Sequence, residues 1–234
     1  MARQPRPRIV SIDGQCYDRH PVRTHCVTAS DDIAQVVEEY TRSHRRPGDW
    51  LTVSEKVVAV AQGRAIPESR IRVGLLARLL WRGVRKVSYG VGLRSPTSMQ
   101  CAINECGRLR ILYAAAVGWL GKLIGRRGDF YRIAGMQAAT IDAAHTSPLQ
   151  PDCVILGPKD PDRIAETIRS ATGCEAAVMD INDIGGSWVL GATAGINRPL
   201  LERIMRDNPC GQKDEQTPVA IVRRVEGDRH EPAV

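Results

Sequence analysis

The segment that most constrains this chain is a short apolar run, Ala176–Met179, followed at once by the polar run Asp180–Asp183 and a glycine pair. The apolar run is typical of a buried strand, and the glycines allow the backbone to turn after it. Ligands of α/β proteins bind beyond the carboxyl ends of such strands. Asp180 and Asp183 carry hard oxygen ligands that suit Mg²⁺ or Mn²⁺. The same residue types build helix N-caps and Asx turns, so the pattern leaves both interpretations open.

Length and composition place the chain among ordinary globular proteins. It has 234 residues, of which 43% are hydrophobic and 25% are charged. No apolar run reaches the roughly 18 residues that a membrane span needs, and the basic start lacks the apolar segment of a signal peptide. The seven cysteines are odd in number and show no zinc-site spacing, so we expect reduced, mostly buried thiols. We therefore expect a cytoplasmic protein that does not interact with membranes.

The net charge of +7 is compatible with an anionic partner. Its basic residues are spread over residues 70–85, Arg126-Arg127 and the two termini, without the interleaved aromatic residues that single-stranded nucleic acids require. A basic site for a multiply charged small molecule explains this charge at least as well as a nucleic-acid surface does. Nucleic-acid binding through residues 70–85 rests on charge alone.

The periodicity of apolar residues predicts an irregular order of strands and helices. We expect strands at residues 8–12, 50–53, 57–61, 130–135, 153–156, 176–180 and 219–225. We expect helices at residues 33–40, 72–82, 109–124, 160–172 and 199–206, and loops at 20–23 and 90–96. This order favours a mixed α+β or irregular α/β fold over a regular doubly wound sheet. We expect a single region, 1–234; the break at Pro148–Pro151 suggests lobes at 1–147 and 148–226, followed by a flexible tail at 227–234.

Two further polar clusters are candidates for binding. Ser54-Glu55-Lys56 interrupts two apolar runs, where Lys56 could neutralise a phosphate and Glu55 could position a metal-bound water. The alternative is a solvated polar loop. The segment 207–218 is a polar loop in which Asn208, Gln212 and Gln216 could recognise a base or close over a substrate. Its alternative is a surface connection. Nothing in the sequence pairs Cys210 of that loop with a base, which argues against a nucleophile.

Several motifs resemble one enzyme family. The stretch from Gly48 to Arg64, with its Gly-Asp start, Lys-Val-Val centre and Ala-Gln-Gly-Arg end, is similar to a signature of the coenzyme F-420-0:L-glutamate ligases, the gamma-glutamyl ligase family. Further similar stretches follow in the family's order and bring the resemblance to about two thirds of the chain. They are residues 22–53, 130–142, 156–162, 180–182 and 217–223.

The resemblance implies an F-420-0:L-glutamate ligase-like fold with a mixed sheet. It also implies an amide ligase of coenzyme F420 biosynthesis that uses GTP, or ATP, with Mg²⁺ or Mn²⁺. Such an enzyme activates a carboxylate of an anionic acceptor as an acyl phosphate and joins it to L-glutamate or another amino acid. The family also implies a homodimer.

The site residues that the resemblance implies fall into two sets. Nucleotide contacts would come from Val22, Arg23, Glu55, Lys56 and Thr140. Metal ligands would come from Asp180, Asp183, Asp142 and Gln137.

The chain departs from the family pattern at several of these positions. Gln137 stands where the family has a metal-binding Asp, Thr140 where it has Asn, and Ile181 where it has Thr. Asp142 and Asp183 lie near enough in sequence to compensate. Residues 90–128 also form an insertion unlike the family. Because the set of metal ligands is incomplete, a non-catalytic relative that binds a nucleotide or another anion remains the alternative.

Overall fold

The computed structural model describes residues 6–83, 92–93, 95–126, 128–146, 150–182, 186–211 and 215–225. The chain divides into two compact units. The first comprises Met1–Ala61 and Asp160–Val234, and the second, Gln62–Lys159, is inserted between them. These bounds differ from the lobes suggested at 1–147 and 148–226, and the tail at 227–234 lies outside the described residues. No helix in the described parts combines the length and apolar character that crossing a membrane requires.

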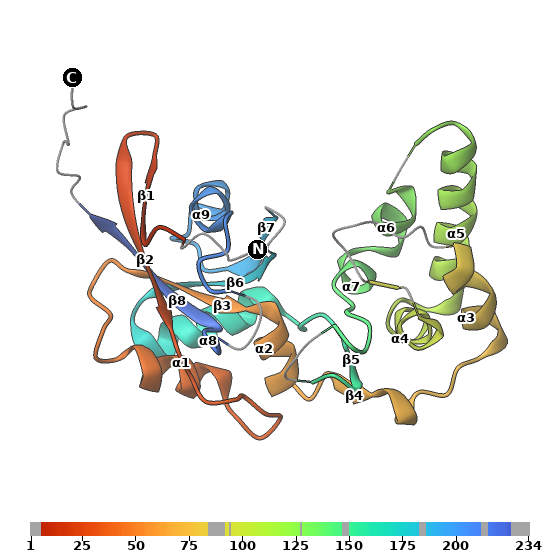
Figure 1. Ribbon diagram of the computed structural model, residues 1–234, viewed down its shortest axis with the longest axis horizontal. Coiled ribbons are helices and arrows are strands. Elements are labelled where there is room, and N and C mark those ends of the chain that lie inside the picture. Colours follow the sequence, from red (N-terminus) through yellow and green to blue (C-terminus); the bar gives the residue numbers. More distant parts are fainter. Residues whose placement is uncertain are drawn as a thin grey trace. The chain divides into compact units, whose positions relative to one another are not determined.

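The first unit is built on a six-stranded mixed sheet in the order β1-β2-β8-β3-β6-β7 (Figure 1). The neighbours β3 and β6 are parallel, whereas every other neighbouring pair is antiparallel. The strands are β1 (Ile9–Ile12), β2 (Gln15–Val22), β3 (Trp50–Ser54), β6 (Glu175–Ile181), β7 (Ser187–Ala192) and β8 (Val219–Val225). This arrangement confirms the expected mixed sheet.

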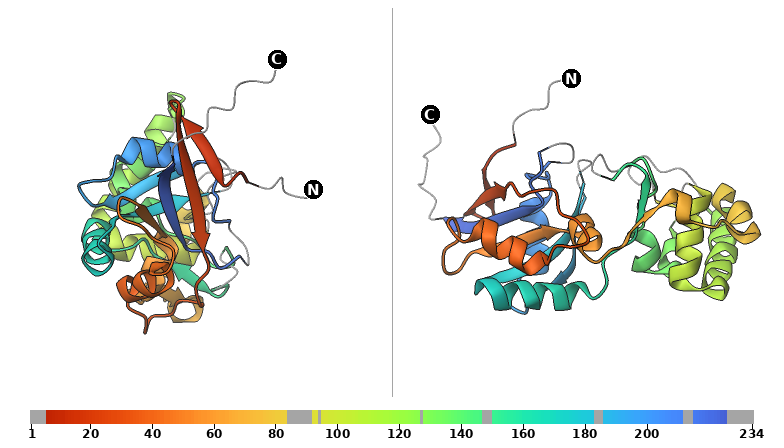
Figure 2. Two further views of the ribbon diagram at one scale, coloured as in Figure 1. Left: turned by 90° about the vertical axis from the view of Figure 1, so that its left-hand side faces the viewer. Right: turned by 90° about the horizontal axis from the view of Figure 1, so that it is seen from below.

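Helices cover both faces of this sheet. Helices α1 (Ile33–Thr41), α2 (Glu55–Ala61) and α8 (Pro161–Thr172) pack on one face, and α9 (Arg198–Met205) packs on the other. Side chains of a strand alternate between faces, so Ala176 and Val178 of β6 join the core under α1, α2 and α8. Ala177 and Met179 join the core under α9. The right-hand view in Figure 2 shows α1 and α8 side by side on their face.

Local sequence signals, such as helix caps, set the limits of several of these elements. Asp32 caps α1 by accepting a hydrogen bond from the Ala34 N–H at 2.9 Å, and Asn197 caps α9 through the Leu200 N–H at 3.2 Å. Pro161 occupies the first turn of α8, where it costs no hydrogen bond. The helices expected at 33–40, 160–172 and 199–206 and the strand expected at 219–225 are confirmed to within about a residue.

Three expectations for the first unit are wrong. Residues 57–61 form helix α2 rather than a strand, because β3 is already hydrogen-bonded to β8 on one side and β6 on the other. The valine-rich run is buried against the sheet as a helix instead. Residues 20–22 belong to strand β2 rather than to a loop, and residues 187–192, where no strand was expected, form strand β7. Tertiary pairing overrides local propensity in each case.

The second unit combines a small two-stranded sheet with short helices around its own core. The sheet pairs β4 (Ala65–Pro67) with β5 (Cys153–Ile155). The helices are α3 (Leu75–Leu80), α4 (Pro96–Cys106), α5 (Arg108–Leu123), α6 (Asp129–Ala134) and α7 (Met136–Ala139), with 3₁₀ turns at Glu68–Arg70 and Trp81–Gly83. Met99, Ile111 and Ile141 are among the fully buried side chains of this core.

Helices α4 and α6 differ from the sequence expectations. A strand was expected at residues 130–135, but residues 130–134 belong to helix α6, which packs closely on α5. Glycines of α5 permit this approach, since a Cβ on Gly121 would lie 2.3 Å from Asp129 Oδ2. No element was expected at residues 96–106, where α4 begins in a capping box formed by Ser95 and Ser98.

Candidate functional site

One edge of the six-stranded sheet gathers the ends of several strands, and we call it the strand-end edge. Strand β2 ends there at Val22, which is paired with Val219 at the start of β8. Strand β3 ends there at Ser54, which is paired with Met179 of the parallel strand β6. Because β3 and β6 are parallel, both of their carboxyl ends lie at this edge, as in sheets that bind ligands beyond their strand ends.

Arg23 and Gln216 meet at the strand-end edge. The Arg23 guanidinium donates a hydrogen bond to Gln216 Oε1 at 3.4 Å, and the Thr24 N–H donates to the Gln216 carbonyl at 3.0 Å. Gln216 has a left-handed backbone with φ of 53°, which turns the chain into β8. The fold thus joins an expected nucleotide contact to an expected substrate-loop residue 193 positions away.

Glu55, Lys56 and Asp180 lie at the same edge. Glu55 and Asp180 are the residues that directly follow the paired residues Ser54 and Met179. Glu55 opens helix α2 and is only 5% exposed, whereas Lys56 and Asp180 are half-buried. By strand alternation Asp180 lies on the sheet face that α2 covers. The expected metal ligand and the expected nucleotide contacts are therefore neighbours in one unit.

Asn182 and Gly186 are hydrogen-bonded to each other between β6 and β7. The Asn182 N–H donates to the Gly186 carbonyl at 2.9 Å, and the Gly186 N–H donates to Asn182 Oδ1 at 3.0 Å. Asn182 therefore makes hydrogen bonds of the Asx-turn type, which is the structural alternative considered for this segment. Asp183 and Gln212, the other expected residues of this region, lie outside the described residues.

Three predicted site residues belong to the second unit. Gln137 is exposed on α7, Thr140 donates to the Met136 carbonyl at 2.9 Å, and Asp142 forms an isolated bridge with Ile155. Thr140 also packs on Gly157, where an added Cβ would lie 1.9 Å from its Oγ1. The roles predicted for these three residues remain predictions.

Comparison with known protein families identifies the chain. The model of the F420-0:Gamma-glutamyl ligase family matches residues 21–196, which include the strand-end edge up to the turn after β6. This match covers well over half of the chain. The chain belongs to the F420-0:gamma-glutamyl ligase family. A comparison with curated proteins gives no match.

A divalent cation is implied for members of this ligase family. Among the described residues, no three His, Cys, Asp or Glu side chains are grouped so that they could hold a metal ion. Mg²⁺ bound together with a nucleotide, however, takes only one or two protein carboxylates and fills its remaining positions with phosphate and water. Glu55 and Asp180, at adjacent strand ends, supply two hard oxygen donors, so their chemistry fits such an ion.

Residues 206–211, the described start of the loop after α9, are held by contacts within this segment and with other parts of the first unit. Asn208 is 1% exposed; its side chain donates to the Gly211 carbonyl at 3.3 Å, and its own carbonyl accepts a bond from Arg6. Cys210 packs against the core under α9, and burial raises its pKa to about 12. Its thiol is therefore protonated at neutral pH, which agrees with the absence of a nucleophile in the sequence pattern.

A histidine that the sequence patterns did not single out lies just after Arg23. His25 Nδ1 is 3.1 Å from the Tyr40 hydroxyl, and His25 Nε2 is 3.3 Å from Asp31 Oδ1. The N–H and hydroxyl of Thr28 both bind the Asp31 carboxylate and, together with His25, lower its pKa. No motif spacing reveals this group, because one loop and one helix have to fold together to form it.

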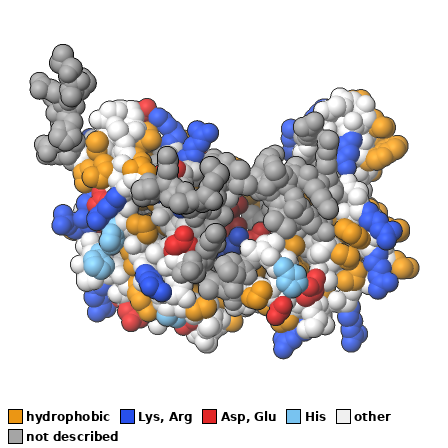
Figure 3. Space-filling view, viewed as in Figure 1, with side chains coloured by type: hydrophobic (Ala, Val, Ile, Leu, Met, Phe, Trp, Pro, Cys, Tyr) orange, Lys and Arg blue, Asp and Glu red, His pale blue; other side chains and the backbone are white. Residues whose placement is uncertain are grey.

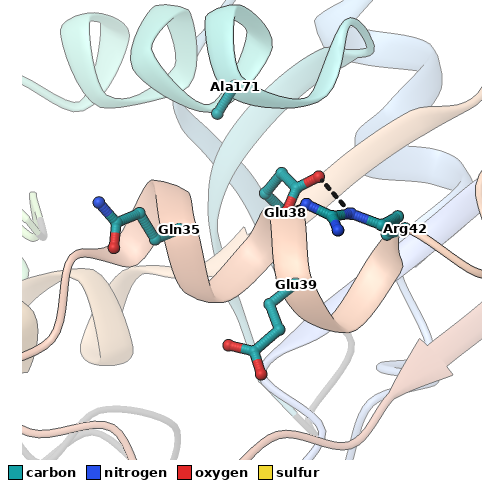
Figure 4. A pocket seen from close by; sticks show the side chains of 5 residues that line it. All are labelled: Gln35, Glu38, Glu39, Arg42 and Ala171. Atoms are coloured by element: carbon teal, nitrogen blue, oxygen red, sulfur yellow. Dashed lines mark hydrogen bonds and ion pairs between the residues drawn. The ribbon is translucent and has the colours of Figure 1, made fainter.

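A surface hollow on the first unit does not belong to the strand-end edge. It is lined by Ala171 of α8, by Gln35, Glu38 and Glu39 of α1, and by Arg42, the C-cap of α1 (Figure 4). Figure 4 shows Glu38 and Arg42 pointing toward one another, and their ion pair measures 2.9 Å. Two carboxylates and a cation that is already paired make this hollow a poor site for a nucleotide.

Proposed function

We propose that this chain is a GTP-dependent gamma-glutamyl ligase that joins L-glutamate to a carboxylate of an anionic acceptor in coenzyme F420 biosynthesis. The observation that supports this proposal is the strand-end edge. It combines Arg23 and Lys56, two cations suited to phosphates, with Glu55 and Asp180, two carboxylates suited to a nucleotide-bound cation. The family match includes all four residues.

The proposed reaction has two steps. An oxygen of the acceptor carboxylate attacks the γ-phosphorus of GTP, the bond from that phosphorus to the β–γ bridging oxygen breaks, and GDP leaves. The neutral amine of glutamate then attacks the acyl carbon of the acyl phosphate. The bond to the phosphate oxygen breaks, inorganic phosphate leaves, and the nitrogen gives up a proton to form the amide.

The chain contributes chiefly position and charge to this reaction. Arg23 and Lys56 offset the negative charge of the triphosphate and of the developing acyl phosphate. Glu55 and Asp180 would hold Mg²⁺ or Mn²⁺, which when bound supplies further neutralisation of phosphate charge. The Arg23–Gln216 contact holds the guanidinium beside the start of β8 and limits its conformational freedom before a substrate arrives.

A non-catalytic nucleotide-binding relative is the second candidate. The observation that favours it is the neutral, exposed Gln137, which stands where the family resemblance places a metal-binding carboxylate. Such a protein would bind GTP at the strand-end edge without turnover. Both candidates would therefore bind GTP, but only the ligase would form a product.

Product formation separates these two candidates. The purified protein is incubated with GTP, Mn²⁺, L-glutamate and coenzyme F420-0, and the deazaflavin product is followed by mass spectrometry. We expect a product one glutamyl residue heavier than the acceptor and stoichiometric release of GDP. Omission of glutamate or GTP is the control and should abolish the product. GTP binding without any product, with ATP tested in parallel, would support the non-catalytic candidate instead.

A further inference from the structure

Helix α5 of the second unit is apolar on two opposite sides. One side packs inside the unit through Ile111 and Ala114, which are fully buried, and through Gly118 and Gly121, which contact helix α6. A helix that is apolar all round is normally covered all round. The outer side of α5 is nevertheless exposed.

The exposed side forms a continuous apolar stripe, which we call the α5 stripe. Its large members recur at the three- and four-residue spacing of one helical face, with Ala116 filling the intervening position. They are Leu109, Leu112, Tyr113, Trp119, Leu120 and Leu123, and their exposed fractions run from 42% to 84%. Leu75 and Leu79 of α3 are exposed in the same unit. Contiguous apolar surface of this kind marks an interaction site.

Cations flank the α5 stripe at both ends. Arg108 and Arg110 lie in its first turn, and Lys122 and Arg126 lie at its end, with no Asp or Glu from residue 108 to residue 128. Cations in a first turn oppose the helix dipole, so helix stability does not explain Arg108. Arg110 donates to the Ile133 carbonyl at 2.8 Å and Lys122 donates to the Gly83 carbonyl at 2.6 Å, and these neutral partners leave both charges uncompensated. The two acids nearest to α5 in the sequence are both paired, Glu105 with Arg64 and the buried Asp129 with Arg126 and Arg132.

The charge of the whole second unit also favours an anionic partner. It contains fifteen Lys and Arg residues against five Asp and Glu, whereas the first unit contains eighteen against twenty-one. The positive net charge of the chain therefore resides in the second unit. Figure 3 shows hydrophobic side chains alternating with Lys and Arg along the margin where α3 and α5 lie.

We propose that the α5 stripe docks this protein on an anionic lipid surface. A basic amphipathic face with Trp, Tyr and Leu lies in the interfacial plane of a bilayer, and flanking Lys and Arg residues bind the headgroups. Tyr113 and Trp119 suit this depth because each has an apolar body and a polar tip. A second copy docked on the same stripe would bring these cations together without acids to pair them, which disfavours self-association through the α5 stripe.

This role requires no membrane-spanning helix. The 16 residues of α5 lie on the surface of the unit, and their inner side is occupied by its core. We expect no membrane contact from the sequence because it has no apolar run long enough to span a bilayer. A helix that lies on the surface of a bilayer does not need such a run. The proposal is independent of the ligase activity.

Vesicle co-sedimentation of the full-length protein tests the proposal. Vesicles of phosphatidylcholine alone are compared with vesicles that also contain phosphatidylglycerol, at low and high salt. We expect binding to the anionic vesicles to exceed binding to the neutral ones by about tenfold or more at low salt and to fall at high salt. Tryptophan emission should shift to shorter wavelength on binding, and Trp119→Phe should remove that shift while binding persists.

Two glutamate variants provide the matched comparison. Leu120→Glu places an acid within the α5 stripe, whereas Ile9→Glu places one at an equally exposed apolar position of the first unit (56% and 55% exposed). Leu120→Glu should lose vesicle binding, Ile9→Glu should keep it, and both should retain the wild-type melting temperature. Absence of binding to anionic vesicles would overturn the proposal. So would a wild-type dimer in light scattering that Leu120→Glu converts to a monomer, because a second copy would then be the occupant.

Discussion

Replacing Asp180 by Asn should reduce the rate of glutamyl transfer by about 10²–10³-fold, the range found when one charge-stabilising group is removed from an active site. Asp180 directly follows Met179 at the end of β6, beside the end of β3, and lies on the face covered by α2. Asn keeps the size of the side chain but removes the negative charge that a nucleotide-bound cation would need. The rate is measured as the amount of product formed per amount of enzyme and per unit time at saturating GTP and glutamate.

The control for this variant is Asp13→Asn. Asp13 is an exposed carboxylate at the turn between β1 and β2, away from the strand-end edge, and it pairs with Arg203 at 2.6 Å. The Asp13→Asn variant should retain the wild-type rate, and both variants should keep the wild-type melting temperature. An Asp180→Asn enzyme that turns over at the rate of Asp13→Asn would remove Asp180 from the proposed site.

Replacing Gly191 by Ala should destabilise the first unit by about 3 kcal/mol, toward the upper end of point-mutation effects. Gly191 lies in β7, and an added Cβ would lie 2.2 Å from the carbonyl carbon of Pro161 and 2.3 Å from the nitrogen of Asp162. Both atoms belong to backbone, which cannot move aside as a flexible side chain can. Asp162 Oδ1 also accepts from the Ala192 N–H at 2.9 Å, which ties the start of α8 to β7.

Thermal unfolding measures this effect. For a chain of this size, about 3 kcal/mol corresponds to a fall in melting temperature of roughly 6–12 °C. Gly83→Ala is the control, because no heavy atom lies within 4 Å of its added Cβ and its φ is not positive. The close approach of α8 to β7 would be disproved if both variants melted at the wild-type temperature.

The parts of the fold that the sequence predicts are those whose local signals agree with their tertiary surroundings. Helix α8 has proline in its first turn, an apolar stripe and Gly173 as its C-cap, so its limits are readable. Strand β8 is a run of valine, alanine and isoleucine that pairs on both sides. The family resemblance is confirmed by the match over residues 21–196.

The missed elements depend on pairing that the local sequence does not encode. The valine-rich run of α2 has the composition of a strand, but the parallel pairing of β3 with β6 requires the chain to leave the sheet after Ser54. Strand β2 contains Pro21 and several polar residues, and it forms because β8 pairs with it along its length. In both elements the sheet decides the structure.

The candidate site is predictable by residue type but not by grouping. The sequence singles out Arg23, Glu55, Lys56, Asp180 and Gln216 one motif at a time. Their presence at one edge follows from the strand order β2-β8-β3-β6, which brings together segments from both ends of the chain. The group formed by His25, Asp31 and Tyr40 leaves no trace in the sequence, because it depends on how one loop folds onto α1.

The central claim is that the strand-end edge binds a nucleotide together with a divalent cation. A thermal-shift titration with GTP, with and without Mg²⁺, tests it most directly on wild type and on Lys56→Met, which keeps the length of the side chain and removes its charge. Wild type should gain about 2.7 kcal/mol at a hundredfold excess of GTP over Kd, only with Mg²⁺ present. The same GTP concentration should stabilise Lys56→Met much less. An equal shift in both proteins, or no shift in wild type, would contradict the account.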